Sequence, residues 1–227
     1  MNVARKEVKY LVSLMQFQTL EPQLAAILPP DAHGDSTGLY HVRSLYFDSL
    51  YDDDYLDTLQ GTDTRKKIRL RVYPPQENDI KLEYKFKQGD DQQKTSIPLS
   101  RGQALEMIGG RYGFLIGISS PKAHTIYHEM TANSYSPKLL IAYDRQAYGL
   151  PDSGIRVTFD TNIRASRLAD SLFSADVHFT PLLEADVGVL EIKRDGPVPA
   201  ELQDLLLGLD SLPAAMSKYV LGRTELS

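Results

Sequence analysis

The sequence predicts an α+β protein built on a β-sheet that closes with its charged face inward. The first observation is the stretch from Arg65 to Lys87, where charged and apolar residues alternate over two successive segments. The second is that a similar charged face recurs in at least three other predicted strands. The third is a set of segments with apolar residues at helical spacing, which predict helices.

Two segments joined by a turn at Pro74 and Pro75 make up this central stretch. The first segment has Arg65, Lys67, Arg69 and Arg71 in alternation with Lys66, Ile68, Leu70 and Val72. The second segment has Lys81, Glu83, Lys85 and Lys87 in alternation with Leu82, Tyr84 and Phe86. Successive side chains of a strand point to opposite sides of a sheet, so each segment is predicted to be a strand with one charged and one apolar face.

An ordinary half-buried strand also alternates, with its charged side chains in water. The first segment argues against that interpretation, because like charges stacked along one strand face repel each other. A solvated face would mix charges of both signs or use Thr, Ser and Gln. We therefore expect the charged faces to hold a polyanion.

Composition limits the possible classes of protein. The chain has 227 residues, of which 42% are hydrophobic, so it can bury a full core. Its net charge of −5 argues against a general nucleic-acid binder, which usually carries a net basic surface. Cysteine is absent, which excludes disulfides, thiolate zinc sites and thiol nucleophiles.

The sequence contains no candidate membrane or targeting segment. No apolar stretch approaches the ~18 residues of a membrane-spanning helix, and the first ten residues, MNVARKEVKY, lack the apolar core of a signal peptide. We therefore expect a cytoplasmic protein. No internal repeat, low-complexity segment or linker is present, so residues 1–227 are predicted to form a single domain.

The remaining elements follow from the same patterns. Further strands are predicted over 5–12, 42–47, 94–99, 139–147, 155–164 and 187–193. Helices are predicted over 13–28, 100–108, 122–132 and 202–209, with a loop or short helix over 48–59. The first helix has Ser13 as its N-cap and ends before Pro29 and Pro30.

Two motifs resemble metal sites but are weak signals. The acidic run from Asp52 to Asp54 could bind a metal, yet adjacent aspartates fan outward and usually form a solvated loop. His124 and His128 have the spacing of zinc ligands, but the glutamate follows the second histidine, as Glu129, instead of the first. We interpret both histidines as ordinary surface or core residues.

The charged faces together carry many more cations than carboxylates. The basic residues that alternation assigns to these faces are Lys9, Lys67, Arg69, Arg71, Lys81, Lys85, Lys87, Arg156, Arg164 and Lys193, with Lys94, Arg145 and Lys218 less firmly assigned. The carboxylates on the same side are Glu7, Glu83 and Glu191. Burying unpaired cations costs several kcal/mol each, so either they pair with these few carboxylates or a ligand supplies the negative charge. Arginine and lysine suit phosphate oxygens, which points to a linear polyphosphate or a nucleoside triphosphate.

Eight short motifs carry a resemblance to a known family. RKEVKY, SLYFDS, RKKIRLRVY, KLEYKFK, AYDRQAY, RVTFDTNIR, VLEIK and SKYV occur in this order. Together they resemble the polyphosphate polymerase domain of the vacuolar transporter chaperone (VTC) complex, a member of the triphosphate tunnel metalloenzymes related to CYTH proteins. The resemblance covers roughly residues 5–224. It implies a closed antiparallel β-barrel of about eight strands, with helices packed on the outside.

The resemblance also implies roles for individual residues. Cations with a catalytic role on the phosphates would be Arg69, Arg71, Lys85, Arg145, Arg156 and Lys218. Substrate-binding residues would be Lys9, Lys67, Lys81, Lys94, Arg164, Lys193 and Tyr219. Glu191 and Glu7 would hold a divalent cation, Mn²⁺ or Mg²⁺. The expected partners are a nucleoside triphosphate and inorganic polyphosphate or tripolyphosphate.

One departure from the CYTH signature narrows the expected chemistry. That signature has glutamates two residues apart before the lysine, and here Arg5 replaces the first of them, ahead of Glu7 and Lys9. Fewer carboxylates favour a polymerase over a two-metal hydrolase. Two alternatives stay open: a triphosphatase that uses the same site with water as acceptor, and a non-catalytic polyanion-binding module. The second is disfavoured by Glu191, because an anion binder gains nothing from a carboxylate among cations.

Overall fold

The computed structural model describes Gly34 and residues 6–31, 38–74, 76–89, 91–150, 154–168, 171–209 and 211–226. Arg5, at which the first strand is predicted to begin, and Pro75 of the predicted turn lie outside these residues. The chain divides into two compact units. The first unit contains residues 1–41, 143–163 and 181–216, and the second contains 42–142, 164–180 and 217–227. This division does not test the single-domain prediction, and each unit is described separately below.

Among the described residues, nine strands form one sheet, and every strand pair with a defined register is antiparallel. The strands are β1 (Lys6–Ser13), β2 (Leu39–Asp48), β3 (Thr64–Tyr73), β4 (Gln76–Gln88), β5 (Asp91–Leu99), β6 (Ser136–Leu150), β7 (Ile155–Ser166), β8 (Thr180–Pro181) and β9 (Val187–Arg194). Their order is β1-β9-β7-β6-β2-β3-β4-β5, with β8 paired to β7. Helices together with this antiparallel sheet confirm the α+β class. In the described part of the chain no hydrogen-bonded ladder joins β1 to β5, so the closed barrel is not confirmed.

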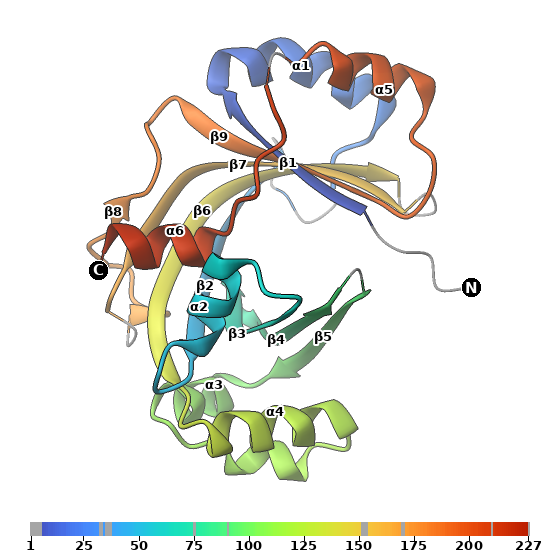
Figure 1. Ribbon diagram of the computed structural model, residues 1–227. Helices are drawn as coiled ribbons and strands as arrows, with labels where there is room; N and C mark the ends of the chain where they lie inside the picture. Colours follow the sequence, from blue (N-terminus) through green and yellow to red (C-terminus); the bar gives the residue numbers. More distant parts are fainter. Residues whose placement is uncertain are drawn as a thin grey trace. The chain divides into compact units, whose positions relative to one another are not determined.

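Two helices of the first unit, α1 (Leu14–Ile27) and α5 (Ala200–Leu207), lie side by side over one face of β1, β7 and β9 (Figure 1). Ser13 and Gln16 start α1 with reciprocal side-chain to backbone hydrogen bonds of 3.1 and 2.9 Å. The stacked rings of Phe17 and Phe159, 3.8 Å apart, join α1 to the sheet. The core of this unit includes Phe17, Leu20, Leu24, Leu28, Val157, Phe159, Leu190 and Leu202.

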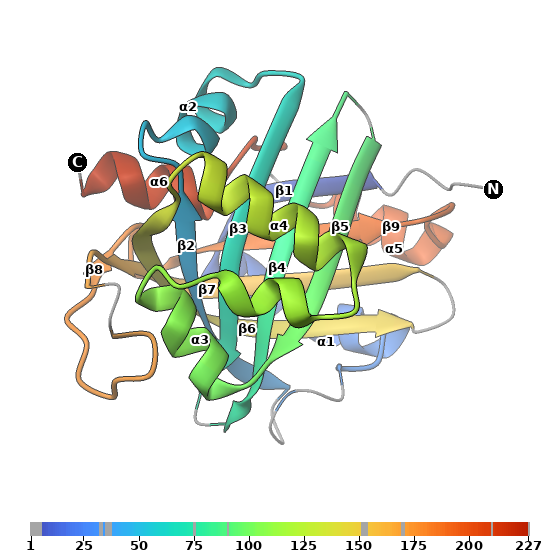
Figure 2. The same cartoon turned by 90° about the horizontal axis from the view of Figure 1, so that it is seen from below.

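The second unit contains the central strands. Its helices are α2 (Asp53–Gln60), α3 (Arg101–Ile108), the 3₁₀ helix η1 (Gly113–Gly117), α4 (Pro121–Ala132) and α6 (Lys218–Glu225). Figure 2 shows α3 and α4 across one face of β3, β4 and β5. The apolar residues predicted to share that face are buried in the core: Ile68, Leu70, Val72, Leu82 and Tyr84. Alternation therefore assigned the two faces of β3 and β4 correctly.

Most sequence-predicted elements are confirmed, with boundaries moved by a few residues. The segment 48–59, predicted to be a loop or a short helix, contains most of α2. That helix ends at Gly61, which adopts a positive φ of 71°. In the described part of the chain, no helix has the length and apolar character needed to cross a membrane.

Leu70 provides a test of this assignment of faces. Its side chain is fully buried between the sheet and the helices, so Leu70→Ala is expected to lower the free energy of unfolding by about 2–5 kcal/mol. Gln92→Ala, at an exposed position of β5, is the control and should change it by less than about 0.5 kcal/mol. Urea unfolding measures both, and equal losses would contradict the assignment.

Candidate functional site

The polar face of β3, β4 and β5 places basic side chains directly opposite one another. The cross-strand pairs are Arg71 with Lys81, Lys67 with Lys85, Arg65 with Lys87, and Lys85 with Lys94. Like charges directly opposite each other destabilise a sheet. An anion placed over this face would therefore reduce the repulsion between these cations.

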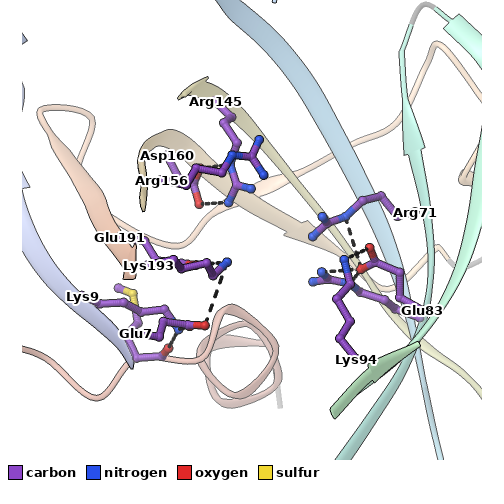
Figure 3. A network of polar contacts seen from close by, with 12 residues as sticks. Glu7, Lys9, Arg71, Glu83, Lys94, Arg145, Arg156, Asp160, Glu191 and Lys193 are labelled. Carbon is purple, nitrogen blue, oxygen red and sulfur yellow. Dashed lines mark hydrogen bonds and ion pairs between the residues drawn. The ribbon is translucent and has the colours of Figure 1, made fainter. Parts of the chain in front are cut away.

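Glu83 is a carboxylate on this face, and it is only 1% exposed. Its Oε2 accepts a hydrogen bond from Arg69 Nε at 2.8 Å and lies 3.7 Å from Arg71 Nε. Its Oε1 lies 2.5 Å from Lys94 Nζ (Figure 3). One buried carboxylate thus forms ion pairs with three cations, two from β3 and one from β5.

The electrostatics of this cluster follow from burial and charge together. Burial alone would raise the pKa of Glu83, but the charges of Arg69, Arg71 and Lys94 outweigh burial and hold that pKa well below its usual range. Burial lowers the pKa of Lys94 from its ordinary value, although Glu83 opposes the effect. Glu83 therefore stays ionised at neutral pH and neutralises part of the basic face.

The remaining predicted residues of the second unit occupy different surroundings. Lys67 Nζ donates to Ser217 Oγ at 2.9 Å, at the start of α6, and Lys218 is the first residue of that helix. Lys81 forms an ion pair with Asp79 at 2.8 Å. Lys85 lies between Lys67 and Lys94 in the register of β3, β4 and β5.

Tyr219 is buried, which bears on its predicted role in substrate binding. Its side chain is 1% exposed, and its hydroxyl donates to Asp48 Oδ2 at 2.7 Å. Burial and the Asp48 charge raise the pKa of Tyr219. The hydroxyl is thus engaged inside the unit.

In the first unit, Glu191 and Glu7 lie near two lysines on neighbouring strands. Glu191 is 6% exposed and forms an ion pair with Lys193. Glu7 lies 2.8 Å from Lys9 Nζ and 3.9 Å from Lys193 Nζ. Lys9 is opposite Glu191 and Glu7 is opposite Lys193 in the β1–β9 register, so charges of opposite sign alternate across these strands (Figure 3).

The two predicted arginines of the first unit each pair with an aspartate. Arg145 Nε and Nη2 donate to Asp160 at 2.6 and 2.8 Å, and both side chains are buried. Arg156 Nη2 lies 2.6 Å from Asp31 and 2.9 Å from the Tyr40 hydroxyl. The bidentate bond fixes the plane of the Arg145 guanidinium.

Arg164 does not share the surroundings of Arg156, although alternation assigned both to one face. Asn162, between them, has a positive φ of 49°. Arg164 belongs to the second unit, where its guanidinium lies 5.3 Å from the centre of the Phe179 ring.

The candidate metal ligands Glu191 and Glu7 do not belong to a preformed carboxylate cluster among the described residues. Within the described residues no group of three or more His, Cys, Asp or Glu side chains is arranged to hold a metal ion. Thr158 lies opposite Glu191 in the β7–β9 register, and its buried hydroxyl has no hydrogen-bond partner among the described residues. Glu191 and Thr158 thus place two side-chain oxygens on neighbouring strands.

The acidic run at 52–54 differs from the solvated loop predicted for it. Asp54 is fully buried and accepts a hydrogen bond from the Tyr135 hydroxyl at 2.9 Å, while its Oδ2 has no partner among the described residues. Burial, together with the charge of nearby Asp48, raises the pKa of Asp54 to about 8. The prediction was wrong because α2 turns Asp54 toward the core. Asp53 is exposed, as predicted, and the half-buried Asp52 pairs with Arg223.

Several supporting residues were missed in the sequence. Asp160 lies within a predicted charged face, so a carboxylate among cations was the available signal. Asp31 gave no local signal, because its partner Arg156 is 125 residues away in the sequence. Asp48 and Tyr46 were also missed; each contacts a residue of another element, Tyr219 and Arg69 respectively.

The fold and these clusters define an α+β protein whose antiparallel sheet carries buried carboxylates among paired cations. A family model for the VTC domain matches residues 4–227, and the chain belongs to the VTC domain family. The resemblance seen in the sequence is thereby confirmed. No curated protein matches the chain.

Two solved structures share the fold. A protein of Bacillus halodurans called a "putative adenylate cyclase" is 14% identical with a TM-score of 0.55, and 93% of this chain and 95% of that one are covered. The PH1819 protein of Pyrococcus horikoshii OT3 is 12% identical with a TM-score of 0.51, and 97% and 99% are covered. At such low identity the likeness concerns the fold alone.

Asp54 predicts a measurable pH dependence. Its pKa is raised from 3.8 to about 8 on folding, so the folded protein retains a proton that the unfolded chain loses between these values. Asp54 therefore stabilises the fold at low pH, and this contribution falls by up to about 1.4 kcal/mol per pH unit between pH 4 and 8.

Asp54→Asn mimics the protonated form and removes this titration. We expect the variant and the wild type to have similar free energies of unfolding near pH 4, and the variant to become increasingly more stable toward pH 8. Urea unfolding across this range measures the difference. A constant difference would contradict the raised pKa, and Asp53→Asn, on the same helix, is the control.

Proposed function

We propose that this protein is a metal-dependent phosphotransferase of the polyphosphate polymerase type. It would take the γ-phosphate of a nucleoside triphosphate, ATP in the simplest case, and add it to inorganic polyphosphate. The proposal includes the closed tunnel that the family resemblance implies. Membership of the VTC domain family supports it.

The observation that carries the proposal is the set of opposed cations on β3, β4 and β5. Lys67, Lys85 and Lys94 lie opposite one another on three neighbouring strands. On a solvated or purely structural face this arrangement would only add repulsion. A linear anion with regularly spaced charges neutralises such a row at several points. Phosphate chains have this spacing, and arginines such as Arg71 bind their oxygens in a planar geometry.

The proposed chemistry needs positioning and charge more than covalent catalysis. A terminal oxygen of the phosphate chain attacks the γ-phosphorus in line, and the bond to the bridging oxygen breaks, so that the nucleoside diphosphate leaves. Negative charge spreads over the transferred phosphoryl group, and preorganised cations stabilise it without reorganising. We assign this role to Arg69, Arg71 and Lys85 in the second unit, and to Arg145 and Arg156 in the first. We assign the same role to Lys218, the first residue of α6.

The residues around Glu191 fit a divalent cation that enters with its substrate. Mg²⁺ and Mn²⁺ prefer oxygen ligands, and Mg²⁺ commonly binds one or two carboxylates together with phosphate oxygens. Glu191, the hydroxyl of Thr158 and the nearby Glu7 supply such oxygens. The cation would neutralise charge on the phosphates, while Lys193 would exchange its ion pair with Glu191 for one with phosphate.

The proposal is tested by ligand binding and turnover in one set of experiments. Tripolyphosphate should raise the melting temperature strongly, ATP somewhat less and AMP hardly at all; at 100 times the dissociation constant the stabilisation is about 2.7 kcal/mol. Duplex DNA should have little effect at the same ionic strength. ATP with Mn²⁺ should then yield phosphate chains, measured separately from free phosphate.

The outcomes of these assays separate the alternatives. Free phosphate without chains would replace the polymerase by a triphosphatase, and binding without turnover would leave a polyanion-binding module. Glu191→Gln is the matched variant: it should retain the thermal shift with metal-free tripolyphosphate and lose Mn²⁺-dependent turnover. Equal shifts from DNA and tripolyphosphate would contradict the proposal.

Glu83 provides a further prediction, because it occupies the cations that phosphate would bind. Glu83→Gln should lower the melting temperature of the free protein, since removing one partner of a buried ion pair costs about 3–5 kcal/mol. Tripolyphosphate should then stabilise this variant more than it stabilises the wild type. Differential scanning calorimetry with and without the ligand measures both effects.

The control for Glu83→Gln is Arg71→Gln, which removes a cation from the same cluster. It should reduce the gain from tripolyphosphate. If Glu83→Gln instead lowered that gain, the carboxylate would be part of the anion site and not its competitor.

A further inference from the structure

A buried network in the second unit joins two of the proposed phosphate-binding cations. It begins at Asp48, the last residue of β2, which is fully buried. Asp48 Oδ1 accepts from the backbone N–H groups of Ser49 and Asp54 at 2.8 and 2.9 Å. Its Oδ2 accepts from the Tyr55 N–H at 2.9 Å and from the Tyr219 hydroxyl at 2.7 Å.

Asp48 therefore stabilises the start of α2 from outside the helix. The N-cap residue Asp52 makes no capping hydrogen bond through its side chain. The first N–H groups of a helix need acceptors, and Asp48 provides them for Asp54 and Tyr55. The fourth hydrogen bond, from Tyr219, attaches α6 to the same carboxylate.

Tyr219 holds α6 against β2 and α2, which Figures 1 and 2 both show beside it. Its ring stacks on Tyr46 with centroids 4.9 Å apart, and it meets the edge of Tyr55 at 6.4 Å. Its hydroxyl also accepts from Arg223 Nη1 at 3.0 Å. Lys218 precedes Tyr219 in the chain, so the docking of Tyr219 determines where Lys218 lies.

Tyr46 extends the network to the polar face. Its hydroxyl accepts from Arg69 Nη1 at 2.7 Å, and the Arg69 guanidinium lies 5.5 Å from the centre of its ring. The other two nitrogens of Arg69 contact Glu83. The orientation of Arg69 thus depends on Tyr46, which is itself stacked on Tyr219.

We propose that Asp48 is a positioning residue that acts through Tyr219 to fix Lys218 and Arg69 for contact with phosphate. This inference rests on the proposed function, because it takes Lys218 and Arg69 as phosphate-binding cations. Asp48, Tyr219 and Tyr46 touch no phosphate themselves. By holding Lys218 and Arg69 in place before binding, these three residues reduce the conformational entropy that the two cations lose when phosphate binds.

A double-mutant cycle tests the inference. The dissociation constant of tripolyphosphate is measured by calorimetry at fixed ionic strength for the wild type, Tyr219→Phe, Lys218→Ala and the double variant. Lys218→Ala should weaken binding by about tenfold or more, and Tyr219→Phe by about 3- to 10-fold. The double variant should lose less binding than the sum of the two single losses, because Tyr219 acts partly through Lys218 and partly through Arg69.

Tyr112→Phe is the matched control for a merely structural effect. Tyr112 is also buried, and its hydroxyl donates to the Tyr135 carbonyl oxygen at 2.7 Å. Its loss should lower the melting temperature as Tyr219→Phe does, and leave the dissociation constant unchanged. An equal weakening by both variants would assign the effect to stability and overturn the inference.

The remaining outcomes separate this inference from the proposed function. Additive losses in the cycle, or unchanged binding by Tyr219→Phe, would overturn the positioning role while Lys218 remained a binding residue. A wild type that does not bind tripolyphosphate would overturn both. If Tyr219→Phe did not fold, Tyr46→Phe combined with Arg69→Ala would give the equivalent cycle, in which non-additive losses support the inference and additive losses refute it.

Discussion

The ion pairs of Glu83 with Arg69, Arg71 and Lys94 are the interaction on which the polar face of the second unit depends. Cations that face each other across β3, β4 and β5 repel, and their burial is costly without countercharge. The Glu83 carboxylate, almost fully buried, offsets part of that cost. It leaves the face with an excess of positive charge, and this excess is what an anionic ligand would neutralise.

The first unit contains charge pairs built on the same principle but arranged differently. Arg145 is held by Asp160 in a bidentate pair, and Glu191 is paired with Lys193, so each buried charge has a close partner of opposite sign. Buried pairs of this kind contribute little net stability, because the desolvation of both charges offsets their attraction. Their effect is geometric, since the bidentate bond holds the Arg145 guanidinium in one plane.

The sequence was sufficient for features determined by near neighbours along the chain. Alternation assigned Ile68 and Leu70 to the core and Arg69 and Arg71 to the polar face, because strand geometry alone decides this. It failed where tertiary contacts decide. Asp54 was predicted to be solvated and is buried, where it accepts a hydrogen bond from Tyr135. The acceptors Asp31 and Asp48 belong to pairs that only the folded topology brings together.

The division of each unit into separate stretches of the chain has a consequence for how the protein folds. The core of the first unit includes Leu202 of α5, and the second is completed by α6, so neither unit is whole until those late helices have been synthesised. Contacts such as Asp48 with Tyr219, 171 residues apart, give a high contact order, which slows folding. On the ribosome, the central strands emerge long before Tyr219 can reach Asp48. Their apolar faces must therefore be covered by α3 and α4 first, and the polar face acquires its final geometry last.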